Sequence, residues 1–145
     1  MPKVLVIYQT FGGKTKSLAE AAAEGASSLG AQAEVKEVSS VNAADLSNVD
    51  GIILATTQPF QSMAGDTKKL FERLWMGRDK IKKDIPFAAI VNYMNDPKAT
   101  EDSLKTIAGH LGLKPVAGSL AVKVSDIEAG KKSARQLGIA MAQGG

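Results

Sequence analysis

The chain of 145 residues contains no cysteine, which excludes disulfides, a thiolate nucleophile and cysteine-ligated metals. Its one histidine, His110, argues against a metal centre built on imidazole ligands. No apolar run approaches the ~20 residues that span a bilayer, and the N-terminal run is too short for a secretory signal. We therefore expect a cytoplasmic protein with no membrane span and no metal.

The residues that are present have the composition of a globular protein. Apolar residues make up 44% of the chain and charged residues 23%, so the chain can bury a core without covalent staples. We interpret residues 1–145 as one domain. Short apolar runs alternate with helical periodicity, which predicts strands at 3–8, 31–38, 51–55, 86–93 and 116–124 and helices at 15–30, 66–75, 100–112 and 127–142.

This alternation predicts an α/β fold, a three-layer sandwich with a five-stranded parallel sheet between two layers of helices. A short helical turn is expected near 44–46, before the third strand. Gly30 and Gly112 are placed to end helices, and Ser125 and Asp126 to begin the last one. The helical stripes place Leu29 and Trp75 in the core.

Ligands of such folds bind beyond the carboxyl ends of the strands, which directs attention to three loops. The first loop is YQTFGGKTKS. Its GKT matches the last three residues of a triphosphate-binding loop, but Tyr8 stands where that loop has its first glycine. The third strand ends in Thr56 and Thr57 instead of a carboxylate for Mg²⁺, which disfavours an NTPase. Gln9 and Thr56 also stand where a phosphoacceptor receiver domain needs acidic residues.

Glycines and hydroxyl groups dominate this first loop. Backbone N–H groups at a helix N-terminus, assisted by the helix dipole, bind anions, and threonine hydroxyls add donors without charge. This chemistry suits a terminal monophosphate. The alternative is that the threonines and glycines only cap the helix.

The segment TFGGKT resembles the phosphate-binding loop of flavodoxin-like proteins, [TS]-x-T-G-x-T. Gly12 stands in place of the middle threonine, which removes one hydroxyl donor. The resemblance implies FMN as cofactor and a sheet with the strand order 2-1-3-4-5. It assigns the phosphate of FMN to Thr10, Phe11, Gly12, Gly13, Lys14 and Thr15.

The loop after the third strand, PFQSMAG, resembles the corresponding loop of the FMN-dependent quinone reductases in that family, which lies against the isoalloxazine ring. An aromatic ring stacked on the flavin would contribute about 0.5–1.5 kcal/mol beyond its buried area. The alternative for Phe60 is an ordinary packed aromatic. The candidate ring-binding residues are Pro59, Phe60, Gln61, Ser62, Met63, Ala64 and Gly65.

The loop after the fourth strand, NYMNDP, is assigned by the same resemblance to the other side of the flavin. Quinone reductases of the family have glycines here, and this chain does not. A helix-capping turn before Pro97 is the alternative for Asn95 and Asp96. The candidate residues are Asn92, Tyr93, Met94, Asn95 and Asp96.

The resemblance implies a redox function in which the cofactor supplies the chemistry, so we predict no catalytic side chain. One possibility is an electron carrier between redox partner proteins. The other is a reductase that passes electrons from NAD(P)H to a quinone-like acceptor. The isoelectric point near 9.1 disfavours a typical acidic carrier, and the PFQSMAG loop favours the reductase.

A flavin-free binding module is the alternative function. The segment 66–84 has seven basic and four acidic side chains, and its 68–83 surface is the candidate contact with an acidic partner. A simple solvated helix face also explains these charges. Few aromatic residues lie near them, which disfavours nucleic-acid binding, and no residue pattern specifies an oligomeric state.

Overall fold

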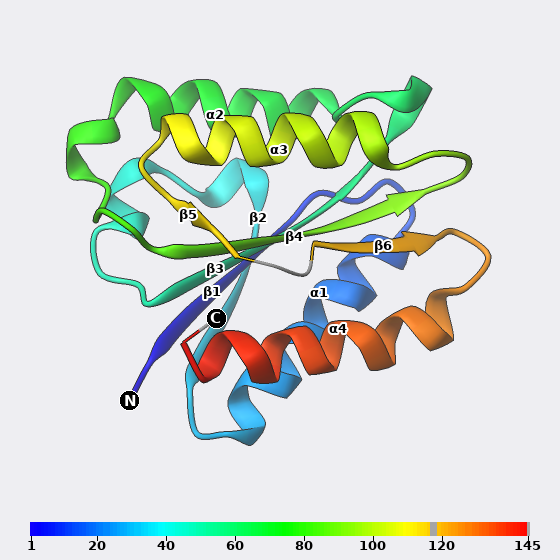
Figure 1. Ribbon diagram of the computed structural model, residues 1–145, viewed down its shortest axis with the longest axis horizontal. Coiled ribbons are helices and arrows are strands. Elements are labelled where there is room, and N and C mark those ends of the chain that lie inside the picture. Colours follow the sequence, from blue (N-terminus) through cyan, green and yellow to red (C-terminus); the bar gives the residue numbers. More distant parts are fainter. Residues whose placement is uncertain (117–118, 145) are drawn as a thin grey trace.

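The computed structural model describes residues 1–116 and 119–144, and a parallel β-sheet lies at its centre (Figure 1). The sheet has the order β2-β1-β3-β4-β5, and β6 also pairs with β4. The predicted 2-1-3-4-5 order is therefore confirmed. The strands are β1 (Lys3–Tyr8), β2 (Gln32–Glu37), β3 (Gly51–Thr57), β4 (Pro86–Tyr93), β5 (Lys114–Pro115) and β6 (Leu120–Lys123).

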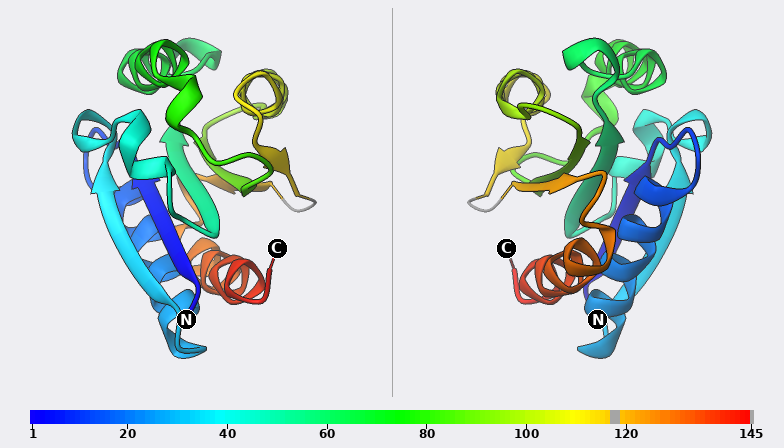
Figure 2. Two further views of the ribbon diagram at one scale, coloured as in Figure 1. Left: turned by 90° about the vertical axis from the view of Figure 1, so that its left-hand side faces the viewer. Right: turned by 90° about the vertical axis from the view of Figure 1, so that its right-hand side faces the viewer.

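Helices cover both faces of the sheet, α1 and α4 on one side and α2 and α3 on the other (Figure 2). The α-helices are α1 (Lys14–Ser28), α2 (Gly65–Met76), α3 (Lys98–His110) and α4 (Ile127–Ala142). Single 3₁₀ turns are η1 (Val38–Ser40), η2 (Ala43–Leu46), η3 (Pro59–Gln61) and η4 (Arg78–Lys80). The turn expected near 44–46 is η2. Within the described residues, no helix is both long and apolar enough to cross a membrane.

The central strands are continuous apolar runs because both of their faces are buried. In β1, Val4 and Val6 pack towards α1 and α4, whereas Leu5 and Ile7 pack towards α2 and α3. Successive side chains of a strand point to opposite faces, so one run of four residues contributes to both cores. This is why the run shows no alternation in sequence.

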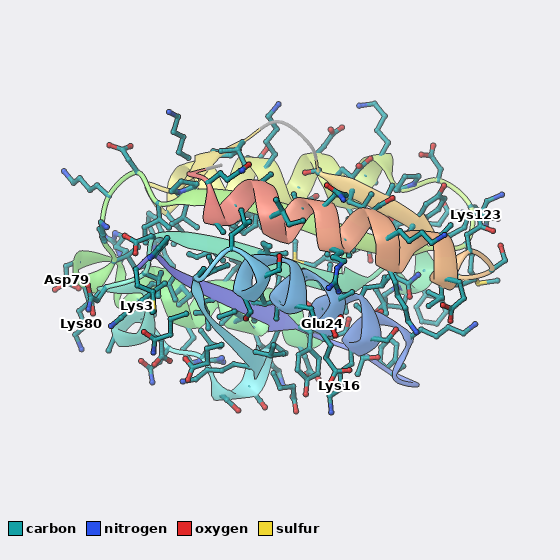
Figure 3. The ribbon with its side chains drawn as sticks, turned by 90° about the horizontal axis from the view of Figure 1, so that it is seen from below. Lys3, Lys16, Glu24, Asp79, Lys80 and Lys123 are labelled. Atoms are coloured by element: carbon teal, nitrogen blue, oxygen red, sulfur yellow. The ribbon has the colours of Figure 1, made fainter. Side chains whose placement is uncertain are left out.

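Helices α1 and α4 pack with their backbones in contact. A Cβ atom at Gly138 would overlap the carbonyl oxygen of Ala22, and one at Gly25 would overlap that of Arg135. At the edge of this contact, Arg135 Nη1 lies 2.9 Å from Glu24 Oε2, and Glu24 is visible on α1 in Figure 3. Glycine at these two positions allows the helices to approach this closely.

The fifth strand differs from the prediction. One continuous strand was expected at 116–124, but two short segments, β5 and β6, pair with opposite ends of β4. Pro115 ends β5 and has no N–H to donate to the sheet, which favours an interruption there. Ala117 and Gly118, within the expected strand, lie outside the described residues.

Two side chains expected in the core are exposed. Leu29 is 48% exposed because α1 ends at Ser28, and the chain turns away at Gly30 with a φ of 84°. Trp75 is 45% exposed because it follows Leu74 by about 100° around α2 and lies at the border of the apolar stripe. Gly112, with a φ of 77°, ends α3 as predicted.

Candidate functional site

The carboxyl ends of the parallel strands meet at one edge of the sheet, on the right in Figure 1. At this edge β2 and β3 lie on opposite sides of β1, which is where the strand order reverses. A pocket of about 300 Å³ opens there. Its lining is Thr10, Phe11, Gly12, Lys14, Thr15, Thr57, Gln58, Pro59, Asn92, Met94 and Val124.

The first loop leads into α1 through a left-handed residue, Gly13, with a φ of 102°. The Gly13 N–H donates to Thr10 Oγ1 at 2.9 Å, which closes the loop upon itself. The N–H groups of Lys14, Thr15 and Lys16 form the first helical turn, where no backbone acceptor exists within the helix. The loop therefore presents a set of amide donors for an anion.

The hydroxyl of Thr15 has another partner. Thr15 is fully buried, and its Oγ1 donates to Asn92 Oδ1 at 3.0 Å. Asn92 is also buried, and its Nδ2 donates to the carbonyl oxygen of Val122 at 3.0 Å. Both polar groups of the Asn92 side chain are thus engaged in joining α1, β4 and β6. These two residues form the wall of the pocket and fix its shape.

A lysine spans the pocket at the same end. Lys14 Nζ donates to the carbonyl oxygen of Val124 at 3.1 Å, which connects the first loop to the segment after β6. Figure 3 shows Lys123 at this end of the molecule. Lys14 lines the pocket, so its ammonium group adds a local positive charge there, which favours an anionic ligand.

A buried glutamine joins the first two loops. Gln9 Oε1 accepts hydrogen bonds from Thr57 N at 2.9 Å, Thr57 Oγ1 at 2.6 Å and Thr56 Oγ1 at 3.1 Å. Thr56 Oγ1 lies 2.8 Å from Thr67 Oγ1 of α2. Gln9 is 3% exposed, so these bonds are shielded from water. They set the position of Thr57, which lines the pocket.

The second loop contains backbone strain. Phe60 and Gln61 both have positive φ angles, 53° and 59°, a region that costs L-residues about 1–2 kcal/mol each. The Phe60 side chain is fully exposed and does not line the pocket. Non-glycine residues in this region concentrate at functional sites, where the surrounding structure holds them.

The other predicted residues of this loop are distributed around its turn. Pro59 lines the pocket, whereas Ala64 is buried and Met63 packs against the core below α2 and α3. Ser62 and Gly65 are exposed beside the start of α2.

The third loop is fixed by contacts with the second. Gln58 Nε2 donates to the carbonyl oxygen of Asp96 at 2.7 Å, while its Oε1 is buried without a hydrogen-bond partner. Asp96 Oδ1 accepts the Lys98 N–H at 3.0 Å, as in the capping alternative for this residue. Met94 lines the pocket, Asn95 is exposed, and Tyr93 packs against the core instead of the pocket.

The pocket thus gathers eight of the predicted residues, from all three loops. Three lining residues were not predicted, Thr57, Gln58 and Val124. Thr57 and Gln58 directly precede Pro59, so they belong to the same loop as the predicted residues 59–65. Val124 was expected at the end of the strand 116–124 and directly follows β6, so the rule that ligands bind at the carboxyl ends of strands points to it as well.

Comparison with known proteins agrees with this geometry. No protein-family profile matches the sequence. An NAD(P)H dehydrogenase (quinone) of Acidithiobacillus ferrooxidans is 30% identical over 78% of this chain and 69% of its own length. The chain belongs to the flavodoxin-like family. Within it, this protein matches solved structures of both flavodoxins and WrbA-like proteins.

The flavodoxin-like fold extends over almost the whole chain. A flavodoxin from the domain Archaea superimposes with a TM-score of 0.87 and 18% identity, covering 97% of this chain and 96% of that one. A WrbA-like flavodoxin from Agrobacterium tumefaciens gives a TM-score of 0.79 and 21% identity, covering 99% and 96%. Identities this low establish a shared fold, and the loops of this chain must supply the argument for a ligand.

Proposed function

We propose that this flavodoxin-like protein binds FMN in the pocket at the carboxyl edge of the sheet and acts as a redox protein. The observation that carries the proposal is the convergence of three loops, each resembling a flavin-binding loop, on one pocket. Amide donors lie at one end of that pocket and apolar side chains along it.

The first loop fits a phosphate monoester. The N–H groups of the first turn of α1 are available, and the space above Gly12 is open, since a Cβ there would meet no atom within 4 Å. Lys14 adds a positive charge beside these amides, although its ammonium group also donates to the Val124 carbonyl oxygen. Because the Thr15 hydroxyl already serves Asn92, the backbone and Lys14 supply most of the phosphate contacts.

The remainder of the pocket fits a planar, partly polar ring. Phe11, Pro59, Met94 and Val124 form apolar walls, and a volume of about 300 Å³ is at the lower limit of ordinary ligand pockets. Gln58 offers an oxygen without a partner beside the second loop. FMN, when bound, supplies the electron-transfer chemistry, while these residues hold the ring and exclude water.

The reductase form of this function has the stronger support. The relative at 30% identity is an NAD(P)H dehydrogenase (quinone). The apolar side chains of Phe11, Phe60 and Met94 are 73%, 101% and 72% exposed and offer a contact surface for an apolar acceptor next to the pocket. NADPH oxidation that depends on an added quinone under anaerobic conditions distinguishes the reductase from a carrier, which shows no such turnover.

The flavin-free alternative loses much of its basis. The Arg73 guanidinium keeps its charge, but its N–H groups are occupied because they donate to the carbonyl oxygens of Val38 and Val41 at 2.6–3.0 Å. Lys68 pairs with Glu72 on the same surface, and Lys82 pairs with Asp50. Three of the seven basic side chains of the segment are thus already engaged within the protein, so fewer of them are available to an acidic partner than the sequence suggests.

The test is a fluorescence titration of FMN and of riboflavin with flavin-stripped protein. Gly12→Asp places a negative charge in the open space above the loop, and Gly12→Asn is the uncharged control of the same size. We expect Gly12→Asp to weaken FMN binding about tenfold or more, and riboflavin binding little, relative to Gly12→Asn. Thr15→Val is a poor probe because it leaves Asn92 Oδ1 buried without a donor.

Failure of the wild-type protein to bind either flavin at micromolar concentrations would contradict the proposal. If Gly12→Asp weakens the binding of FMN and of riboflavin equally, the protein still binds flavin, but the phosphate of FMN does not lie at the first loop.

A further inference from the structure

One side chain of the pocket has a hydrogen-bonding atom that the protein leaves unused. Gln58 is half-buried and lines the pocket where the second loop meets the third. Its Nε2 donates to the carbonyl oxygen of Asp96 at 2.7 Å, whereas its Oε1 is buried and accepts no hydrogen bond from the described residues. A buried acceptor without a donor costs free energy, so each such atom in a folded protein calls for an explanation.

The orientation of the Gln58 amide is fixed by its partner. A carbonyl oxygen only accepts hydrogen bonds, so the atom of Gln58 that contacts Asp96 must be the nitrogen. The exchange of nitrogen and oxygen that leaves many side-chain amides ambiguous is therefore excluded here. It follows that the unpaired atom is an acceptor and that its missing partner is a donor.

The pocket has a second side-chain amide, and the protein uses both of its ends. Asn92 Oδ1 accepts from Thr15 Oγ1 at 3.0 Å, and Asn92 Nδ2 donates to the carbonyl oxygen of Val122 at 3.0 Å. Asn92 thus completes the structure of the protein itself. Gln58, in contrast, has an acceptor left for a ligand.

The flavin ring carries the donor that this acceptor lacks. The oxidised isoalloxazine ring has a single N–H group, the imide N3–H, and its other polar ring atoms, N1, N5, O2 and O4, only accept. We propose that Gln58 Oε1 accepts the N3–H of the flavin, so that Gln58 is the side chain that selects the ring. This inference rests on the proposed function, because it takes the pocket as the flavin site.

The turn that begins at Gln58 can adjust to the ring. Because Oε1 is covered in this structure, the ring reaches it after a small shift of the turn 58–61. Phe60 and Gln61 in this turn have φ angles of 53° and 59°. A shift that returns either residue to a negative φ releases strain, so this turn opposes the change less than a relaxed turn would.

Fluorescence titration of the flavin-stripped protein with FMN and with FMN methylated at N3 (3-methyl-FMN) tests this contact. The methyl group removes the donor and leaves the phosphate unchanged. A site built to hydrogen-bond an N–H group rejects an analogue that lacks it, because its own polar atom is then left unpaired. We expect the wild type to bind 3-methyl-FMN about tenfold or more weakly than FMN.

Replacing the acceptor should abolish this preference. Leucine is similar in size to glutamine but accepts no hydrogen bond, so Gln58→Leu should bind the two flavins within about threefold of each other. This variant also loses the contact with Asp96, which weakens both flavins alike and leaves their ratio unchanged. The ratio therefore reports the contact with N3, whereas a purely supporting role of Gln58 would not change it.

Two further variants separate the acceptor from the shape of the pocket. Gln58→Glu keeps an acceptor oxygen but, when ionised, cannot donate to the Asp96 carbonyl oxygen. It should bind both flavins more weakly and keep a preference of about tenfold for FMN. Met94→Leu is the matched control, because it replaces one apolar lining residue by another of similar size. It should keep the wild-type preference.

Loss of the preference in Gln58→Leu and its retention in the other two variants support the contact. An equal preference in the wild type and Gln58→Leu overturns it, and so does loss of the preference in Met94→Leu or Gln58→Glu, since the preference then does not follow the acceptor. A wild type that binds FMN without any preference contradicts this inference alone. A wild type that binds neither flavin contradicts the proposed function as well.

Discussion

Replacing Gln9 by leucine tests whether the buried hydrogen bonds under the pocket stabilise the protein. Leucine has a similar size but cannot accept the three hydrogen bonds that Gln9 Oε1 receives from Thr56 and Thr57. Thr56 keeps its partner Thr67, 2.8 Å away. The two donors of Thr57, its N–H and its hydroxyl, lose their acceptor.

The expected loss of stability follows from these two donors. A buried polar group left without a partner costs about 1–3 kcal/mol. Thr57 is only half-buried, so water reaches part of it, and the lower half of that range applies to each donor. Gln9→Leu should therefore lower the free energy of unfolding by about 2–4 kcal/mol. For a chain of this length, the melting temperature should fall by roughly 5–15 °C.

Urea unfolding of the flavin-free protein, followed by circular dichroism, measures this change. Gln136→Leu on the exposed face of α4 is the matched control, because leucine and glutamine have nearly equal helix propensity. The control should unfold within about 0.5 kcal/mol of the wild type. If Gln9→Leu also unfolds within that interval, the Gln9 hydrogen bonds make no net contribution and the reasoning is wrong.

Two further predictions concern the helix contact and acid stability. Gly138→Ala should destabilise the protein by about 1–3 kcal/mol because its Cβ overlaps the Ala22 carbonyl, whereas Gly109→Ala, in open space on α3, should stabilise it by about 0.5–1 kcal/mol. If Gly138→Ala and Gly109→Ala shift the urea midpoint of the wild type in the same direction, the backbones of α1 and α4 are not in contact at Gly138. The Lys3 N–H, followed by the Lys82 ammonium, lowers the pKa of Asp50 below its ordinary value of 3.8. Its contribution is therefore fully present above that pH and lost as the pH falls below it. The difference in melting temperature between wild type and Asp50→Asn should be largest near pH 7 and shrink as the pH falls below 3.8; a constant difference across this range would contradict the assignment.

The sequence predicted the layers because the signals for them are local, whereas the strand order came from the resemblance to flavodoxin-like proteins. Apolar runs such as β3 and the helical stripe of α2 repeat within a few residues, and each repeat reports a buried face directly. Three candidate loops follow from the same pattern, since the carboxyl ends of parallel strands meet at one edge. The pocket at that edge contains residues from all three.

The sequence could not predict which polar groups are already engaged. Thr15 was assigned to the phosphate from its place in the TFGGKT segment, yet its hydroxyl donates to Asn92, 77 positions later in the chain. Arg73 was counted among the seven basic residues of the segment 66–84, and its guanidinium donates to the carbonyl oxygens of Val38 and Val41. Trp75 was expected in the core because it continues the apolar stripe of α2. How much of that stripe is buried depends on how α3 packs beside α2.

The sequence by itself therefore determined the order of elements, the parallel sheet and the edge at which a ligand would bind. These depend on periodicity and on glycines at helix ends, which neighbouring residues encode. Only the tertiary structure decided that Gln9, Thr15 and Asn92 support the pocket and that the Trp75 surface is open. Such pairings depend on strand register and helix packing, which bring together residues that have no relation along the chain.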